Sequence, residues 1–231
     1  MGRVIYPLVG GMMALGLIAA PHDAEATIVW SFTNEFSGSG GTLSGPVVVT
    51  LSDGGGSGSV NVTIDTSGLD ALLPEFVTGL YLNLNPILNP TSVGVSFPTN
   101  NTDPQGSFSR GTNAFQADGD GKYDILISWA VPAGVGRFEA DEIDTVTFAL
   151  AGLVEEDFFF LSHPAGGHGP FHAALRAQGL GANGQGSGWF SPTGGFDPGN
   201  EIPVPEPGSL ALFGFGLAGL ALAIRRRRKI S

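Results

Sequence analysis

Short segments of alternating hydrophobic and polar residues recur between residues 27 and 161, with turn-forming residues between them. The clearest is Val-Asn-Val-Thr-Ile-Asp at 60–65, where every second residue is apolar. Because neighbouring side chains of a strand point to opposite faces, this period of two predicts half-buried β-strands. The other segments of this kind are 27–32, 47–51, 80–84, 123–131, 144–150 and 158–161. We therefore expect an all-β fold, an antiparallel β-sandwich of the jelly-roll or immunoglobulin-like type.

Glycine and proline divide the chain between these segments. The sequence Asp-Gly-Gly-Gly-Ser-Gly at 53–58 predicts a hairpin loop. Residues 69–77 form the one segment with helical character, and Pro74 limits that helix to about one or two turns. Residues 179–203 are rich in Gly, Asn, Ser and Pro, which is typical of a linker. We therefore assign the β-sandwich domain to residues 27–178.

The N-terminal 26 residues have the pattern of a secretory signal peptide. Arg3 precedes an uncharged apolar run at 4–21, and the segment closes with Ala24-Glu25-Ala26, a small-x-small cleavage site. The alternative is an uncleaved anchor helix, which Pro7 and Pro21 disfavour. We therefore expect residues 1–26 to be removed and the following domain to fold outside the cytoplasm.

An uncharged run of 17 residues at 208–224 is followed by five consecutive cations. At about 1.5 Å per residue, a helix of this length spans roughly 26 Å, which suffices for a thin bilayer. The cations are Arg225, Arg226, Arg227, Arg228 and Lys229. By the positive-inside rule they hold the C-terminus in the cytoplasm and leave the domain exported. The pattern predicts a single C-terminal transmembrane helix, with a soluble core helix as the alternative.

Pro205, Glu206 and Pro207 stand immediately before this helix. The tripeptide, the apolar helix and the arginine cluster, at 204–231, together resemble the PEP-CTERM sorting signal of exported proteins in Gram-negative bacteria. The resemblance implies recognition by an exosortase, a membrane-embedded sorting enzyme that cleaves near the tripeptide. The helix would then tether the precursor transiently to the inner membrane. The product would reach the cell envelope, the outer surface or the extracellular matrix.

The negative charge of the chain excludes one class of partner. The whole chain has a formal charge of −11, and residues 27–206 carry 19 acidic and four basic residues, a net −15. Phosphate binding needs a basic surface, so nucleic acid is excluded as a partner. The chain has no cysteine, which excludes disulfides, zinc fingers, iron–sulfur clusters and thiol nucleophiles.

Asp118, Asp120 and Asp124 place three carboxylates within seven residues, with glycines at 119 and 121. Calcium prefers several oxygen ligands, and a D-x-D-G-x-x-D loop supplies them. The loop resembles the calcium loops of integrin-type propeller repeats, although it occurs once. The alternative is an acidic hairpin turn, because Asp-Gly pairs are common in such turns. Calcium is the leading cofactor candidate.

One histidine cluster and two acidic clusters are weaker candidates for a functional site. His163, His168 and His172 could bind zinc or copper, but their loop is rich in Gly and Pro, and we expect a surface loop. The acidic clusters at 139–142 and 155–157 could serve a hydrolase as acid and base. The nucleophile, phosphate-loop, dinucleotide and metalloprotease motifs are absent from the sequence. We therefore expect a protein that is not an enzyme.

The leading hypothesis is an exported surface or extracellular-matrix protein, sorted by an exosortase, with a structural or interaction role in biofilm or floc. Extracellular polysaccharide is its candidate partner. The first alternative is a carbohydrate-binding module of the envelope, with Trp30, Trp129 and Trp189 as the candidate sugar-binding aromatics. The second alternative is an envelope hydrolase that uses the acidic clusters.

Overall fold

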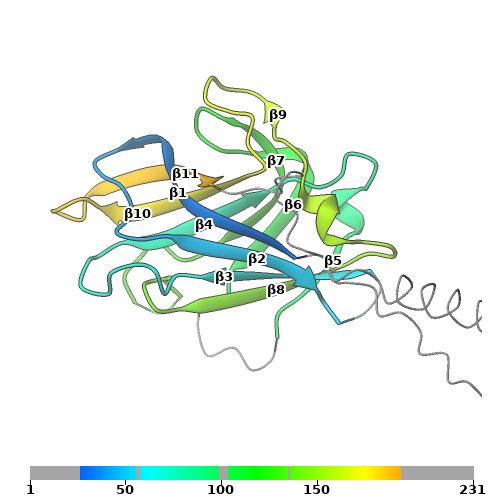
Figure 1. Ribbon diagram of the computed structural model, residues 1–231, viewed down its shortest axis with the longest axis horizontal. Coiled ribbons are helices and arrows are strands. Elements are labelled where there is room, and N and C mark those ends of the chain that lie inside the picture. The colour runs from blue at the N-terminus through cyan, green and yellow to red at the C-terminus, as the bar shows by residue number, and fades with distance from the viewer. Residues whose placement is uncertain (1–26, 56–57, 99–103, 135, 194–231) are drawn as a thin grey trace, which may run out of the picture. The chain divides into compact units, whose positions relative to one another are not determined.

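The computed structural model describes residues 27–55, 58–98, 104–134 and 136–193, which form an antiparallel β-domain with almost no helix (Figure 1). The strands are β1 (Ile28–Ser39), β2 (Val47–Asp53), β3 (Ser59–Asp65), β4 (Phe76–Leu82), β5 (Gly94–Ser96), β6 (Ser107–Gln116), β7 (Gly121–Ser128), β8 (Ile143–Ala149), β9 (His163–Pro164), β10 (Ala173–Leu180) and β11 (Gly186–Thr193). Two 3₁₀ turns, η1 (Pro90–Ser92) and η2 (Glu155–Phe158), are the helical elements of the described residues. The expected all-β antiparallel class is confirmed.

One continuous sheet contains all these strands, in the order β5-β8-β3-β2-β1-β11-β10-β4-β7-β6, with β9 added beside β7. The long strand β1 joins the two halves of this path, because its first residues pair with β2 and its later residues pair with β11. Two register shifts interrupt its pairing with β11, and such bulges bend a strand. The finer assignment to a jelly-roll or immunoglobulin-like sandwich stays a prediction.

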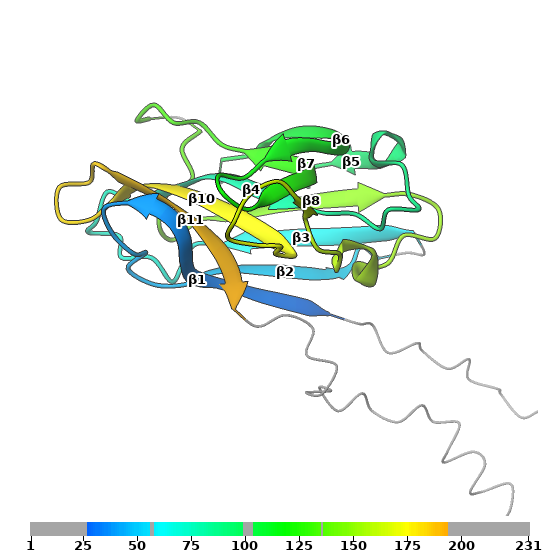
Figure 2. The ribbon, with the colours of Figure 1, turned by 90° about the horizontal axis from the view of Figure 1, so that it is seen from above.

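The two ends of the sheet approach each other. Phe108 of β6 lies with its ring centre 5.6 Å from that of Phe148 on β8. Seen from above, β6 and β7 lie near β5 and far from β1 (Figure 2). The main core therefore lies between the two halves of one curved sheet.

Alternation in the sequence determines which side chains fill that core. In β3, Val60, Val62 and Ile64 are fully buried, while the residues between them are partly exposed. Trp30 and Phe32 of β1 are fully buried in the same cluster. Burying a side chain of this size contributes about 1.5–3 kcal/mol, so these positions dominate the stability of the domain.

Three sequence predictions are wrong in this structure. Residues 69–77 form turns and the start of β4 in place of a helix. Phe158 ends η2, and residues 159–161 after it form no strand. The linker predicted from residue 179 begins too early, because β11 (Gly186–Thr193) lies between β1 and β10 in the sheet. The β-domain therefore extends at least to Thr193, beyond the predicted limit of 178.

The predicted hairpin at 53–58 is confirmed, since β2 and β3 pair on either side of it and the Gly54 amide donates to the Ser59 carbonyl at 2.9 Å. The predicted signal peptide and the sorting signal, with its transmembrane helix, lie outside the described residues. Within the described residues, no helix has the length and apolar character needed to cross a membrane.

Candidate functional site

The acidic loop at 117–120 is a tight hairpin between β6 and β7. The Ala117 amide donates to the Gly121 carbonyl at 3.1 Å, and the Asp120 amide donates to the Ala117 carbonyl at 3.3 Å. Gly119 has a φ of +77°, a left-handed conformation that side chains rarely adopt. The backbone thus explains the Asp-Gly pattern as a turn.

Asp120 lies beneath this turn, with only 1% of its surface exposed. Its carboxylate accepts hydrogen bonds from the hydroxyls of Tyr123 and Ser162, the latter at 3.1 and 3.2 Å. The Phe171 amide donates to the Ser162 hydroxyl at 3.3 Å. Burial raises the pKa of Asp120, and these hydrogen bonds oppose the rise. Burial also raises the pKa of the Tyr123 phenol, and the neighbouring Asp120 carboxylate raises it further.

The other two aspartates have different partners. The Asp124 carboxylate accepts from the backbone amides of Leu84, at 3.1 Å, and Asn113, at 2.8 Å. Asp118 is exposed and accepts from the Ser37 hydroxyl at 3.1 Å. Among the described residues, no three His, Asp or Glu side chains gather in an arrangement that could hold a metal. Calcium binding by the three aspartates stays a prediction.

The three histidines lie in different surroundings. His163 belongs to β9 and pairs with Lys122 of β7. His168 contacts the hairpin, its amide donating to the Gly119 carbonyl at 2.8 Å. His172 stacks on Phe159 with ring centres 3.8 Å apart, and burial lowers the pKa of its imidazole. The loop from 162 to 172 therefore packs over the β6–β7 hairpin.

Trp189 packs beside Tyr81 and Arg176. The centre of its ring is 5.1 Å from that of Tyr81. The guanidinium carbon of Arg176 lies 5.4 Å from the centre of the Trp189 ring. Burial raises the pKa of Tyr81, and the positive charge of Arg176 opposes this effect. Tyr81 and Arg176 carry no signal in the sequence that would have placed them beside Trp189.

Trp189 is the most exposed of the three tryptophans. Trp30 is fully buried, and Trp129 is 5% exposed, with its indole N–H donating to the Asp144 carboxylate at 2.9 Å. Trp189 is partly exposed. Of the sugar-binding candidates named from the sequence, Trp189 alone could meet a ligand.

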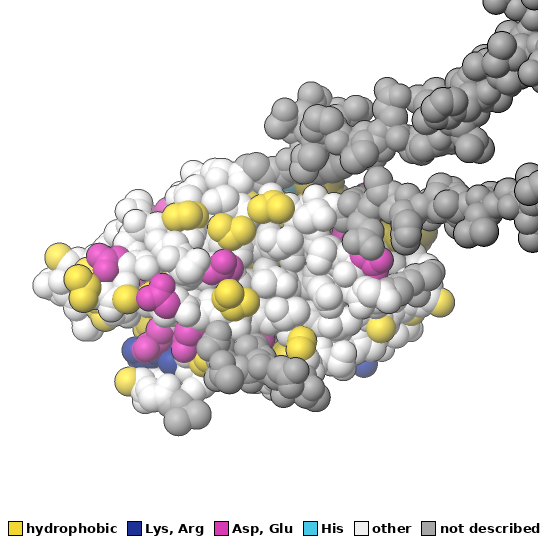
Figure 3. Space-filling model, turned by 60° about the horizontal axis from the view of Figure 1, so that its bottom comes forward, with side chains coloured by type: hydrophobic (Ala, Val, Ile, Leu, Met, Phe, Trp, Pro, Cys, Tyr) yellow, Lys and Arg dark blue, Asp and Glu magenta, His cyan; other side chains and the backbone are white. Residues whose placement is uncertain are grey.

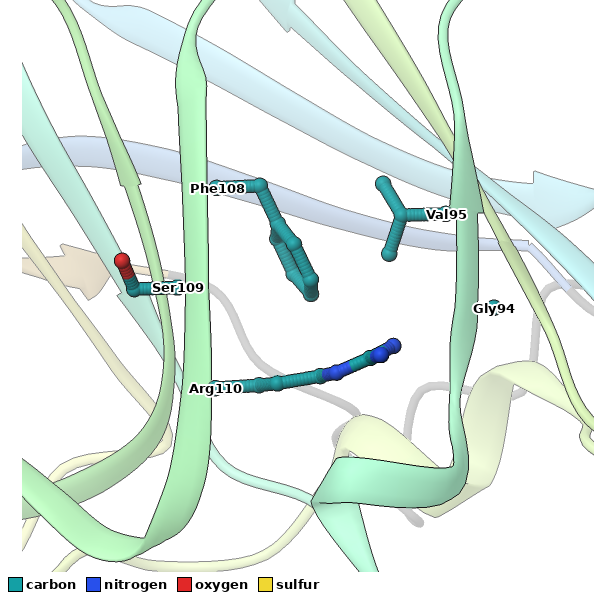
Figure 4. Close-up of a pocket in the computed structure, with 5 residues that line it drawn as sticks. All are labelled: Gly94, Val95, Phe108, Ser109 and Arg110. Atoms are coloured by element: carbon teal, nitrogen blue, oxygen red, sulfur yellow. The ribbon is translucent and has the colours of Figure 1, made fainter.

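A hollow of about 410 Å³ lies between the two ends of the sheet, lined by β5 and β6 (Figure 4). Its lining residues are Gly94, Val95, Phe108, Ser109 and Arg110. No sequence pattern indicates this hollow, because β5 and β6 face each other only once the sheet has curved. On the face shown in Figure 3, acidic side chains are spread across the surface and Lys or Arg side chains lie at its margins.

Comparison with known proteins bears on the C-terminal region. Residues 203–228 match the PEP-CTERM protein-sorting motif. Comparison with curated proteins and with solved structures finds no match for the chain. The matched segment contains Pro205, Glu206 and Pro207 and four of the five terminal cations. The chain therefore carries the PEP-CTERM sorting motif, which implies an exported protein that an exosortase recognises and processes at the envelope.

Proposed function

We propose that the exported domain acts as a structural or interaction protein of the cell surface or extracellular matrix, in contact with extracellular polysaccharide. The sorting motif at 203–228 is the observation that carries this proposal. A chain delivered to the envelope by such a motif acts where polysaccharide and neighbouring cells are its available partners.

The described domain is consistent with this role. Acidic side chains are spread over the face shown in Figure 3, and the domain has a continuous core whose largest side chains are fully buried. A folded domain of this kind presents fixed surfaces to a partner without requiring a catalytic group. The biofilm or floc is the material to which it would contribute.

The test compares retention in the matrix. Cells that possess the sorting enzyme express the full chain, and in parallel an unrelated exported domain joined to residues 194–231 of this chain. We expect both to be processed and only the native domain to remain with the extracellular matrix after washing. Equal release of both products into the medium would contradict a matrix role for the domain.

Carbohydrate binding is a second candidate, favoured by the partly exposed Trp189 beside Tyr81 and Arg176. An aromatic face with a flanking guanidinium offers a sugar both stacking and hydrogen bonds. Trp189→Ala should then abolish retention on immobilised neutral oligosaccharides. The matched control is Phe160→Ala, which removes a ring that is 36% exposed on a different segment. Retention unchanged by Trp189→Ala would exclude this site.

A further inference from the structure

The hollow between β5 and β6 combines an open position with a fixed lining. The side chains of Phe108 and Arg110 extend from β6 toward β5, where Val95 faces them, while the side chain of Ser109 points away (Figure 4). Its volume of about 410 Å³ lies within the range of small-ligand sites, roughly 300–1,000 Å³. One or two sugar rings would fit a space of this size.

Arg110 gives this hollow its charge. The guanidinium carbon lies 5.6 Å from the centre of the Phe108 ring, and the side chain is exposed. Among the described residues, the one ion pair joins Arg137 to Glu139, so no carboxylate in this part of the chain pairs with Arg110. A guanidinium that pairs with none of the described carboxylates, in a domain with an excess of such groups, is a local site for an anion.

Phe108 and Val95 supply the apolar wall. Both are partly buried and pack against the main core, which fixes their positions. The face of an aromatic ring carries partial negative charge, and the C–H groups of a pyranose ring pack against it. A planar carboxylate beside such a ring could meet the guanidinium through two parallel hydrogen bonds.

The strands that border the hollow are poorly suited to bind an extended peptide as an added strand. β5 has three residues, and such a short edge offers a partner strand very few backbone hydrogen bonds. The pairing of β6 with β7 is irregular between Arg110 and Phe115, and Asn113 has a positive φ of 50°. Irregular edges of this kind block strand addition.

We propose that the hollow between β5 and β6 binds a carboxylate-bearing sugar residue of an acidic polysaccharide, with Arg110 holding the carboxylate and Phe108 the sugar ring. The proposal deepens the proposed matrix role and rests on it for the nature of the partner. The acidic surface elsewhere would repel such a polymer, so contact would be confined to this position.

The test uses the full chain, purified in detergent, and titrates three probes of similar length: an oligouronate, a neutral oligosaccharide and an oligoglutamate peptide. Calorimetry measures each affinity at low salt. Arg110→Gln removes the guanidinium, and the matched control Lys122→Gln removes the same charge from an exposed position on β7. Thermal melting of each variant confirms that the fold is retained.

We expect the oligouronate to bind. Arg110→Gln should weaken its affinity about tenfold or more, and Lys122→Gln should change that affinity less than about threefold. Equal affinity for the neutral oligosaccharide would overturn the role of the carboxylate. If the oligoglutamate binds more tightly than the oligouronate, the ligand is an acidic peptide and the proposed sugar ligand is wrong. An equal loss of oligouronate affinity in both variants would show that net charge alone causes the effect. If no probe binds, the proposed site is refuted. These results are independent of whether the domain is retained in the matrix.

Discussion

Replacing Asp120 with alanine tests the buried polar network that it forms with Tyr123 and Ser162. The carboxylate accepts from the Tyr123 and Ser162 hydroxyls, and it links the β6–β7 hairpin to the loop that precedes β10. Tyr123 is fully buried and Ser162 is 3% exposed, so neither hydroxyl can turn to bulk water. Asp120→Ala therefore leaves two buried donors without their acceptor.

The magnitude follows from these contacts. A hydrogen bond to a charged group contributes about 1.5–3 kcal/mol, so two of them give about 3–6 kcal/mol. The substitution also removes the cost of burying a carboxylate, which offsets part of the loss. We expect the free energy of unfolding to fall by about 2–4 kcal/mol.

Urea denaturation of the processed protein measures this change. Asp118→Ala is the matched control, because it makes the same substitution two residues away in an exposed carboxylate that accepts from Ser37. An exposed position of this kind should cost less than about 0.5 kcal/mol. If the two variants lose the same stability, the network does not hold the hairpin as argued.

Three further predictions concern other parts of the chain. Burial lowers the pKa of His172, so its contribution to stability is present above the unfolded-state pKa of about 6.5 and is lost as pH falls through the folded-state value. His172→Asn should therefore reduce the loss of stability on acidification, measured by denaturation at several pH values. An unchanged loss of stability at low pH would contradict this role of His172. If Asp118, Asp120 and Asp124 bind calcium, added calcium should raise the melting temperature and Asp120→Ala should abolish that rise, whereas equal melting temperatures with calcium or chelator would leave only the hairpin-turn interpretation. N-terminal sequencing of the exported protein should begin at Thr27, and a chain that retains Met1 would refute signal-peptide cleavage.

Three of the strands that the sequence predicted, β2, β3 and β8, have one buried face. β3 alternates fully buried and partly exposed residues, so its period of two was visible. β6 was missed because all its residues are exposed or partly exposed at an edge of the sheet, which leaves no apolar pattern. β10 was missed for the opposite reason, because Ala173, Ala174 and Leu175 are consecutively buried in its interior position.

β11 is a strand whose composition is typical of a linker. Its Gly and Ser residues predicted a linker, yet its position between β1 and β10 buries Phe190 and Ser191. Small residues are accommodated there because two strands supply the backbone hydrogen bonds on both sides. Sequence reasoning at 158–161 failed differently, since the apolar run contains one fully buried ring, Phe158, and the exposed Phe160 and Leu161.

The candidate sites depend on contacts that are distant in sequence. Ser162 reaches Asp120 across 42 residues, and Arg176 reaches Trp189 through the pairing of β10 with β11. The hollow requires the two ends of the sheet to meet. No local pattern carries such information. The sorting motif, by contrast, is linear, and it was therefore recognisable from the order of its parts.

The most direct test of exosortase sorting is the intact mass of the chain in cells that possess the enzyme. The parent is compared with a variant in which Pro205, Glu206 and Pro207 are alanine, which keeps the apolar run and the terminal cations. We expect the parent to be recovered without its C-terminal segment and the variant to accumulate at the inner membrane at the mass of the uncleaved precursor. If the variant is processed and released as efficiently as the parent, the tripeptide is not read by a sorting enzyme and the account is contradicted.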